Sequence, residues 1–231
     1  MRALLLTSLF ALAACGGSTG SVSLAARATD ATTALLTQTQ ANADLSLGRV
    51  RLLIAEAELH GGGCRASFCA RGRVEQGPFI ATLTGEQAAS GATTDVLMAD
   101  VPAGRYHEAE LELESLHRDH RGCHHRAPDT LGAEFADFQK TGATVIVDGA
   151  FQGQAFTWSG AIDAEQETKG PITVEAGKSV SLGLVVDAAS WFVDASGAPL
   201  DPRSAESQAV IAANVKKSLS IEDDTDRRPR H

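Results

Sequence analysis

The chain has 231 residues, of which 43% are hydrophobic and 21% are charged, and this composition suits one globular domain with a real core. Its formal net charge of −9 argues against nucleic-acid binding, which needs a basic patch. Beyond the N-terminal segment, no stretch approaches the roughly 18 consecutive apolar residues of a membrane span. Glycine is frequent, aromatic residues are few, and Val, Thr and Ile gather in short runs, which favours β structure.

The N-terminus has the layout of a secretory signal peptide. Arg2 supplies a positive charge, residues 3–12 are apolar, and small residues precede Cys15, so residues 1–14 are predicted to be removed. The run Leu12-Ala13-Ala14-Cys15 resembles the lipobox of bacterial lipoproteins. This resemblance implies a thioether-linked lipid on Cys15 and acylation of the new N-terminus, and several acyl chains anchor a protein stably. An ordinary signal peptide cut nearby is the alternative.

The resemblance also implies a location. In enterobacterial lipoproteins an Asp after the lipidated cysteine favours the inner membrane, so Gly16 points to the outer membrane. We therefore expect a cell-envelope protein, anchored in the outer membrane and facing either the periplasm or the cell surface.

Residues 15–46 are predicted to be a flexible tether. Gly, Ser, Thr, Ala and Gln dominate after Cys15, and large apolar side chains are scarce. A short helix is expected around Thr32 to Thr37. A coil of about 30 residues has a typical reach of roughly 30 Å.

Residues 47–219 are predicted to form one β-sandwich domain. The first strand covers Leu47 to His60, where apolar residues alternate up to Ile54 and the apolar phase then moves to Ala57 and Leu59. A phase change inside a strand indicates a β-bulge. Further strands are predicted at residues 79–83, 94–98, 105–116, 144–147, 155–162, 172–174 and 180–186.

The strand predicted at 105–116 has the cleanest alternation in the chain. Its apolar face carries Ala109, Leu111 and Leu113, and its charged face carries Glu108, Glu110, Glu112 and Glu114. Period two with one charged face is typical of a half-buried antiparallel strand. The glutamates could bind cations or a basic partner, although the solvated face of a sheet is the simpler interpretation.

One helix is predicted near the C-terminus. Asp201 and Pro202 have the residue types of an N-cap and a first helical position. Ile211, Val215 and Leu219 recur every four residues, as in a helix that packs on a sheet. Trp191 and Phe192 are expected to cover the core, and residues 220–231 are predicted to be a charged, disordered tail.

The predicted fold class is therefore mainly β, an antiparallel β-sandwich with one C-terminal helix. The strand from Val50 to His60, followed by Val101-Pro102-Ala103-Gly104-Arg105-Tyr106, resembles an uncharacterised bacterial lipoprotein family with a prealbumin-like, carbohydrate-binding-like sandwich. Here Val101 stands where Leu is usual. The resemblance covers residues 47–186 and implies extracytoplasmic binding or surface structure rather than catalysis.

Cysteine and histidine residues gather in two predicted loops. With Cys15 acylated, an odd number of cysteines remains, which indicates a disulfide with one spare thiol, or a metal site. The disulfide candidates are Cys64, Cys69 and Cys123. The candidate zinc or copper ligands are Cys64, Cys69, His117, His120, Cys123, His124 and His125, with His60 and His107 close to them in sequence.

Two observations weaken the metal hypothesis for these loops. The spacing of the cysteines matches no standard zinc motif. Arg118, Arg121 and Arg126 lie among the histidines and would repel a cation. A loop disulfide and a solvated basic loop are the alternatives.

No enzyme motif is recognised, since the chain lacks a Gly-x-Ser-x-Gly elbow between a predicted strand and a predicted helix, a His-Glu-x-x-His pair and a phosphate-binding Gly loop. Trp158, Trp191 and Tyr106 could stack on sugars if exposed, but both tryptophans fit the core better. The sequence thus predicts a non-catalytic binding or scaffold domain without a cofactor, with the membrane, through acylated Cys15, and an unknown envelope ligand or protein as partners. The alternative is a lipoprotein that handles zinc or copper through the two Cys/His loops.

Overall fold

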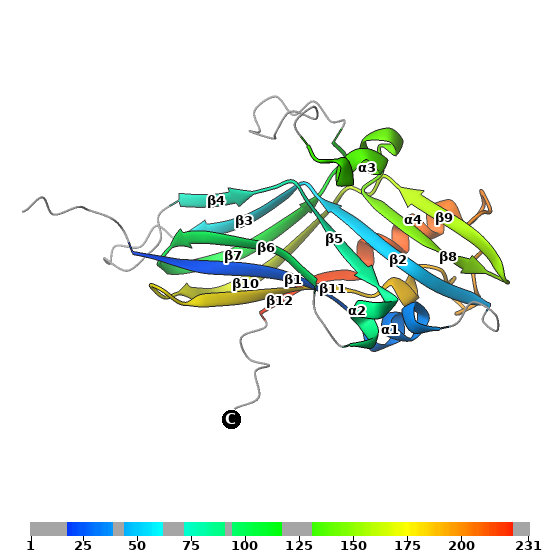
Figure 1. The fold of residues 1–231 in the computed structure, drawn as a ribbon, viewed down its shortest axis with the longest axis horizontal. Coiled ribbons are helices and arrows are strands. Elements are labelled where there is room, and N and C mark those ends of the chain that lie inside the picture. The colour runs from blue at the N-terminus through cyan, green and yellow to red at the C-terminus, as the bar shows by residue number, and fades with distance from the viewer. Residues whose placement is uncertain (1–17, 39–43, 62–71, 91–93, 117–130, 224–231) are drawn as a thin grey trace, which may run out of the picture.

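The computed structural model describes residues 18–38, 44–61, 72–90, 94–116 and 131–223. These residues form three four-stranded sheets, in which antiparallel pairs dominate (Figure 1). The fold is mainly β and is consistent with a β-sandwich that carries one C-terminal helix, so the predicted fold class is confirmed. None of the helices in the described part of the chain has the length and apolar character of a membrane span.

The first sheet has the order β12-β11-β1-β6. Its strands are β1 (Thr19–Ala28), β6 (Thr94–Pro102), β11 (Ser179–Val186) and β12 (Leu219–Asp223). β1 lies inside the sheet, parallel to β11 and antiparallel to β6.

The position of β1 overturns the predicted tether. Within the predicted tether of residues 15–46, residues 19–28 form a central strand, and α1 (Asp30–Thr37) follows, close to the expected short helix. Val22, Leu24 and Ala26 alternate toward the core and are at most 7% exposed. Small residues separate these apolar ones, so the composition of the segment indicated a coil. The apolar residues nevertheless alternate with period two, which is the period of a strand.

The second sheet has the order β10-β7-β3-β4. Its strands are β3 (Glu56–Gly61), β4 (Gly72–Gln76), β7 (Gly104–Leu113) and β10 (Ala164–Val174). β7 confirms the strand predicted from the glutamate alternation, with Ala109, Leu111 and Leu113 buried. β10 is much longer than the predicted strand at 172–174.

The third sheet has the order β5-β2-β8-β9. Its strands are β2 (Leu45–Ile54), β5 (Phe79–Thr84), β8 (Val145–Phe151) and β9 (Gln154–Gly160). The phase change predicted to be a β-bulge is instead the point at which the chain passes, at Ala55, from β2 of this sheet to β3 of the second sheet. Ile54 before this point and Leu59 after it both face the main core, and the apolar phase moves where the chain changes sheets.

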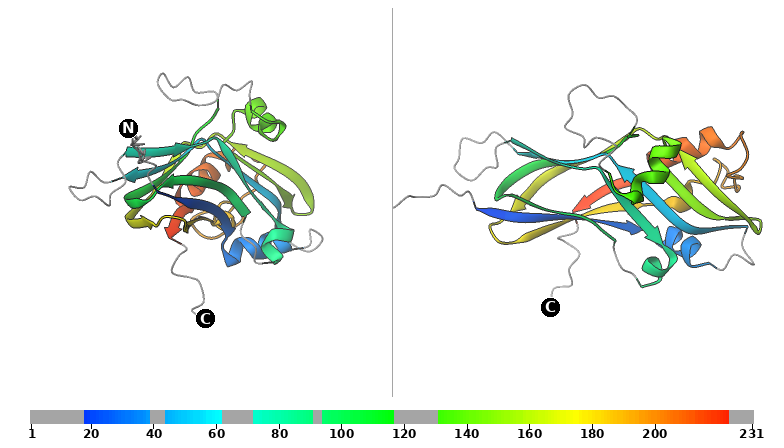
Figure 2. Two further views of the ribbon diagram at one scale, coloured as in Figure 1. Left: turned by 60° about the vertical axis from the view of Figure 1, so that its left-hand side comes forward. Right: turned by 45° about the horizontal axis from the view of Figure 1, so that its top comes forward.

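Helices cover both faces of the third sheet. The outer face packs Leu53 and Ile146 against η2 (Ala133–Phe135) and α3 (Ala136–Thr141). α4 (Gln208–Lys217) buries Ile211 and Val215 in the main core together with Leu219, which belongs to β12. The remaining elements are α2 (Gly85–Ala89), beside α1 in both views of Figure 2, and η3 (Ala188–Ser190).

Two predicted boundaries near the C-terminus are wrong. The helix begins at Gln208 and not at Asp201, whose carboxylate instead accepts hydrogen bonds from the backbone and guanidinium of Arg203 in a turn. The predicted tail begins too early, because Ser220 to Glu222 pair with β11. Ile221 is 7% exposed, so this strand is held by apolar burial as well as by backbone pairing.

Aromatic side chains fill the centre of the main core. Trp191 and Phe192 are fully buried, as predicted, and the Phe192 ring makes edge-on contacts with Phe156 and Trp158 at centroid distances of 5.7 and 6.3 Å. The Trp158 indole donates a hydrogen bond to Gln208, which fixes the start of α4 against β9. Trp158, Trp191 and Tyr106 are all buried, so none of them offers a surface for stacking on sugars.

Tyr106 provides a test of the packing at the turn between β6 and β7. Its hydroxyl donates a hydrogen bond of 2.8 Å to the carbonyl of Pro102, and burial raises the pKa of the phenol. Replacing Tyr106 with Phe should lower the free energy of unfolding by about 1 kcal/mol at neutral pH.

The same substitution should show a pH dependence of known sign. The unfolded chain loses the phenol proton near pH 10, before the folded chain does, so the contribution of Tyr106 is complete below that pH and declines above it. Urea unfolding of wild type and Tyr106→Phe at pH 7.5 and above pH 10 measures this effect. An equal difference at both pH values would contradict it.

Candidate functional site

The outward face of the β10-β7-β3-β4 sheet carries glutamates directly opposite one another on neighbouring strands. One cross-strand row contains Glu165, Glu112 and Glu56, and the next contains Glu167, Glu110, Glu58 and Glu75. A third row, one step further along, contains Lys169, Glu108, His60 and Arg73. Like charges directly opposite each other destabilise a sheet. The stability of this face therefore depends on the basic side chains that lie beside the glutamates.

Arg73 neutralises the carboxylates at the β3–β4 side. Its guanidinium lies 3.0 Å from Glu56, contacts Glu58, and lies 3.9 Å from Glu75. The side chains of Glu56 and Glu58 are only 3% and 5% exposed. Two nearly buried carboxylates therefore share one arginine, which has the fork geometry for this role.

Lys169 serves the β10 side in the same way. Its ammonium lies 2.5 Å from Glu167 and 3.6 Å from Glu108. The hydrogen bond from Lys169 lowers the pKa of Glu167. The hydrogen bond between Glu165 and Glu167, together with the charge of Glu110, raises the pKa of Glu165. On β10, Glu165 is thus less well compensated than Glu167.

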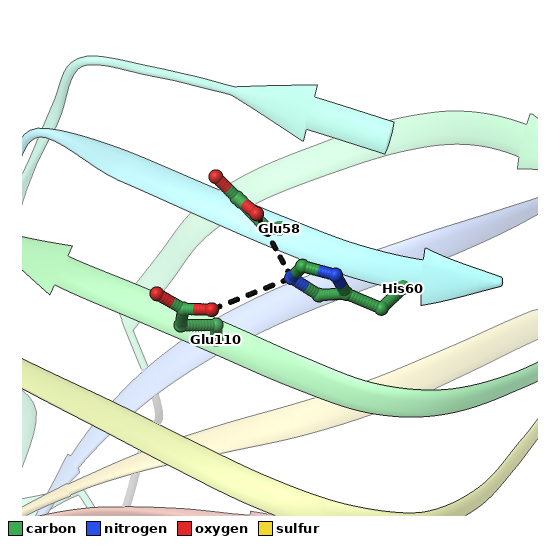
Figure 3. A group of neighbouring side chains, drawn as sticks. All are labelled: Glu58, His60 and Glu110. Carbon is green, nitrogen blue, oxygen red and sulfur yellow. Dashed lines mark ion pairs between the residues drawn. The ribbon is translucent and has the colours of Figure 1, made fainter. Parts of the chain in front are cut away.

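His60 occupies the middle of the face, between two carboxylates (Figure 3). Its Nε2 lies 2.9 Å from Oε2 of Glu58 on the same strand and 3.3 Å from Oε2 of Glu110 on β7. Alternation in β3 places Glu58 and His60 on one face, and the pairing of Glu58 with Glu110 brings the third group beside them.

A β-bulge beside this group turns His107 outward. His60 pairs with Glu108 and Gly61 pairs with Tyr106, so His107 is the extra residue on β7. His107 and Glu108 then both face solvent, and the rings of His107 and His60 lie 6.3 Å apart in an edge-on arrangement. The side chain of His107 is 59% exposed.

The residues predicted as the lipidation site and as disulfide or metal candidates lie outside the described residues. These are Cys15, Cys64, Cys69, His117, His120, Cys123, His124 and His125. The predictions for these residues, including the zinc or copper alternative, stay predictions. Of the histidines named with them, His60 and His107 are described, and both lie on the charged face.

Sequence reasoning identified one strand of this face and missed its neighbours. The stripe on β7 was recognised, and three of its members, Glu108, Glu110 and Glu112, lie on the face as predicted. Glu165, Glu167 and Lys169 were missed because the polar segment that carries them did not suggest a strand, although its charges recur with period two. Glu58 was missed because this part of the strand was predicted from Ala57 and Leu59, which lie on the opposite, apolar face.

No protein-family model, curated protein or solved structure matches this chain.

The dependence of the buried carboxylates on Arg73 is testable. Replacing Arg73 with Met leaves Glu56 and Glu58 without their shared cation, and should lower the free energy of unfolding by about 1–3 kcal/mol. Lys169→Met is the matched control, because its partners are more exposed and their charges are solvated. Urea denaturation of both variants measures the difference, and equal stabilities would contradict this role for Arg73.

Proposed function

We propose that this chain is a cell-envelope lipoprotein, anchored in the outer membrane through acylated Cys15, whose β-sandwich is a non-catalytic binding domain. The observation that carries the binding role is the charged face of the β10-β7-β3-β4 sheet, where His60 lies between Glu58 and Glu110. A face that places carboxylates opposite one another lowers stability, and a cationic ligand offsets that cost. The anchor is supported by the run Leu12-Ala13-Ala14-Cys15 after an apolar segment.

In the structure, the first strand begins only a few residues after the proposed anchor. Only Gly16, Gly17 and Ser18 separate Cys15 from Thr19, the first residue of β1. Four residue steps span at most about 14 Å, against the reach of roughly 30 Å expected for a long tether. An acylated Cys15 would therefore hold the sandwich close to the membrane surface.

The start of β1 also determines which end of the sandwich would face the membrane. The carbonyl of Thr19 accepts a hydrogen bond from Gly177 in the β10–β11 turn, and the carbonyl of Ser18 accepts one from Ala103 before β7. Figure 1 shows this end of β1 and the β8–β9 hairpin at opposite ends of the longest axis. The β10–β11 turn would thus lie near the lipid, and the β8–β9 hairpin far from it.

Mass spectrometry of the mature N-terminus tests the anchor. We expect a chain that begins at Cys15 and carries the mass of a diacylglyceryl group and a further acyl chain. Cys15→Ser should abolish both the acyl mass and the membrane association. A mature protein that stays in the soluble fraction and carries no acyl mass would overturn the proposal.

Protease accessibility tests the orientation. A specific protease site is inserted at Ala176 in the β10–β11 turn, or at Gln152 in the β8–β9 turn, both of which are exposed. On liposomes, cleavage near Ala176 should be at least several-fold slower than cleavage near Gln152. In detergent the two sites should be cut at similar rates. Equal protection of both sites on liposomes would contradict the orientation.

A further inference from the structure

The geometry points to a binding site for a divalent transition-metal ion, with Zn²⁺ as the reference case, formed by His60 Nε2 and one carboxylate oxygen each of Glu58 and Glu110. This inference rests on the proposed binding role of the charged face and names its class of ligand. An imidazole nitrogen with two carboxylate oxygens is a mixed donor set of the kind that zinc accepts. These donors are different residues from the cysteines and histidines of the two predicted loops, which lie outside the described part of the chain.

The spacing of the donor atoms fits one ion. The His60 nitrogen lies 2.9 and 3.3 Å from the two oxygens, and all three donors lie within 4.8 Å of one another. Zinc bonds of about 2.0–2.2 Å place two donors of a tetrahedral ion roughly 3.3–3.5 Å apart. Small side-chain rotations are therefore enough to bring the three donors onto one ion.

The orientation of the His60 ring fits a metal ion bonded to Nε2 better than a hydrogen bond between Nε2 and either carboxylate. His60 Nε2 is inaccessible to solvent and has no hydrogen bond of acceptable geometry among the described residues, although two carboxylate oxygens lie at ion-pair distance. A hydrogen bond weakens steeply when the N–H does not point at the acceptor. An ion bonded to this nitrogen would instead contact both oxygens at once.

Of the two groups of possible metal ligands on this face, the one that contains His60 is the better candidate. Glu56, Glu58 and Glu75 also bring three carboxylates together, but Arg73 already occupies that cluster. Because Arg73 contacts Oε1 of Glu58, it holds the carboxylate in place and leaves Oε2 directed toward His60. A hydrogen-bonded ligand of this kind is well oriented for a metal, and the surrounding glutamates attract a cation.

The exposure of the group predicts an exchangeable ion. Glu58 is nearly buried, whereas the side chains of His60 and Glu110 are 28% and 23% exposed. Three protein donors leave a fourth position for water or for a group on a ligand, which is the arrangement of open zinc sites rather than of closed structural ones.

Isothermal titration of the full-length chain in detergent with Zn²⁺ tests the site. We expect one site in which His60→Ala and Glu110→Gln each weaken binding at least tenfold. Two control variants alter the same face without touching a donor. His107→Ala removes the neighbouring histidine, and Glu167→Gln removes the charge directly opposite Glu110. Both should bind within about threefold of wild type.

Retention of tight binding in both His60→Ala and Glu110→Gln overturns the site, as does the absence of zinc binding in wild type. Thermal unfolding checks that each variant folds. If His60→Ala does not fold, the zinc affinity of the isosteric Glu110→Gln decides whether the site exists. Co²⁺ in place of Zn²⁺ separates this site from one built by cysteines. A thiolate-to-cobalt charge-transfer band that persists in His60→Ala assigns the ion to the cysteines and overturns the proposal.

The acyl mass on Cys15 is measured separately, so failure of the metal site and failure of the anchor give different results. A lipidated chain without zinc binding keeps the anchor and rejects the ion. A zinc-binding chain without acyl mass keeps the site and rejects the anchor.

Discussion

The placement of glutamates opposite one another on the outward face of the β10-β7-β3-β4 sheet is the constraint on which the site depends. Carboxylates directly opposite one another on neighbouring strands repel each other and destabilise the sheet. Three basic groups from the adjacent row reach back toward them: Lys169 on β10, His60 on β3 and Arg73 on β4. Lys169 and Arg73 serve carboxylates toward the two sides of the sheet, whereas His60 lies between Glu58 and Glu110. The centre of the face is thus the place where a divalent ion changes the balance most.

The apolar side of the same strands keeps the glutamates in that register. Leu59, Ala109 and Leu111 face the main core and are at most 6% exposed. A slip of one residue would turn these side chains to solvent and the glutamates to the core, at a cost far above that of the repulsion. The hydrophobic core therefore fixes the charged face, and the charged face cannot relax by shifting its strands.

Sequence patterns predicted those features that depend on a single segment of the chain. The alternation in β7, the burial of Trp191 and Phe192, and the helix with Ile211 and Val215 follow from local period and hydrophobicity, and all are present. The site itself depends on long-range pairing. Glu58 and Glu110 are far apart in the chain, and only the register of β3 with β7 brings them to His60. Local patterns carry no information about which strands become neighbours, so the stripe was predicted and its partners were not.

The predicted tether failed for a reason that matters to function. β1 is rich in alanine and serine, yet Val22 and Leu24 recur with period two, and burial between β6 and β11 makes a strand of it. Since β1 starts four residues after Cys15, a lipid there would hold one end of the sandwich at the membrane. His60 pairs with Glu108 and Glu58 pairs with Glu110, so the proposed metal-binding group lies near the middle of β7 and not at that end. At about 3.3 Å per residue, Glu110 lies roughly 20 Å along β7 from its start, which exceeds the distance of about 10 Å over which surface charge acts. The neighbouring glutamates, and not the membrane, would therefore attract the cation to this site.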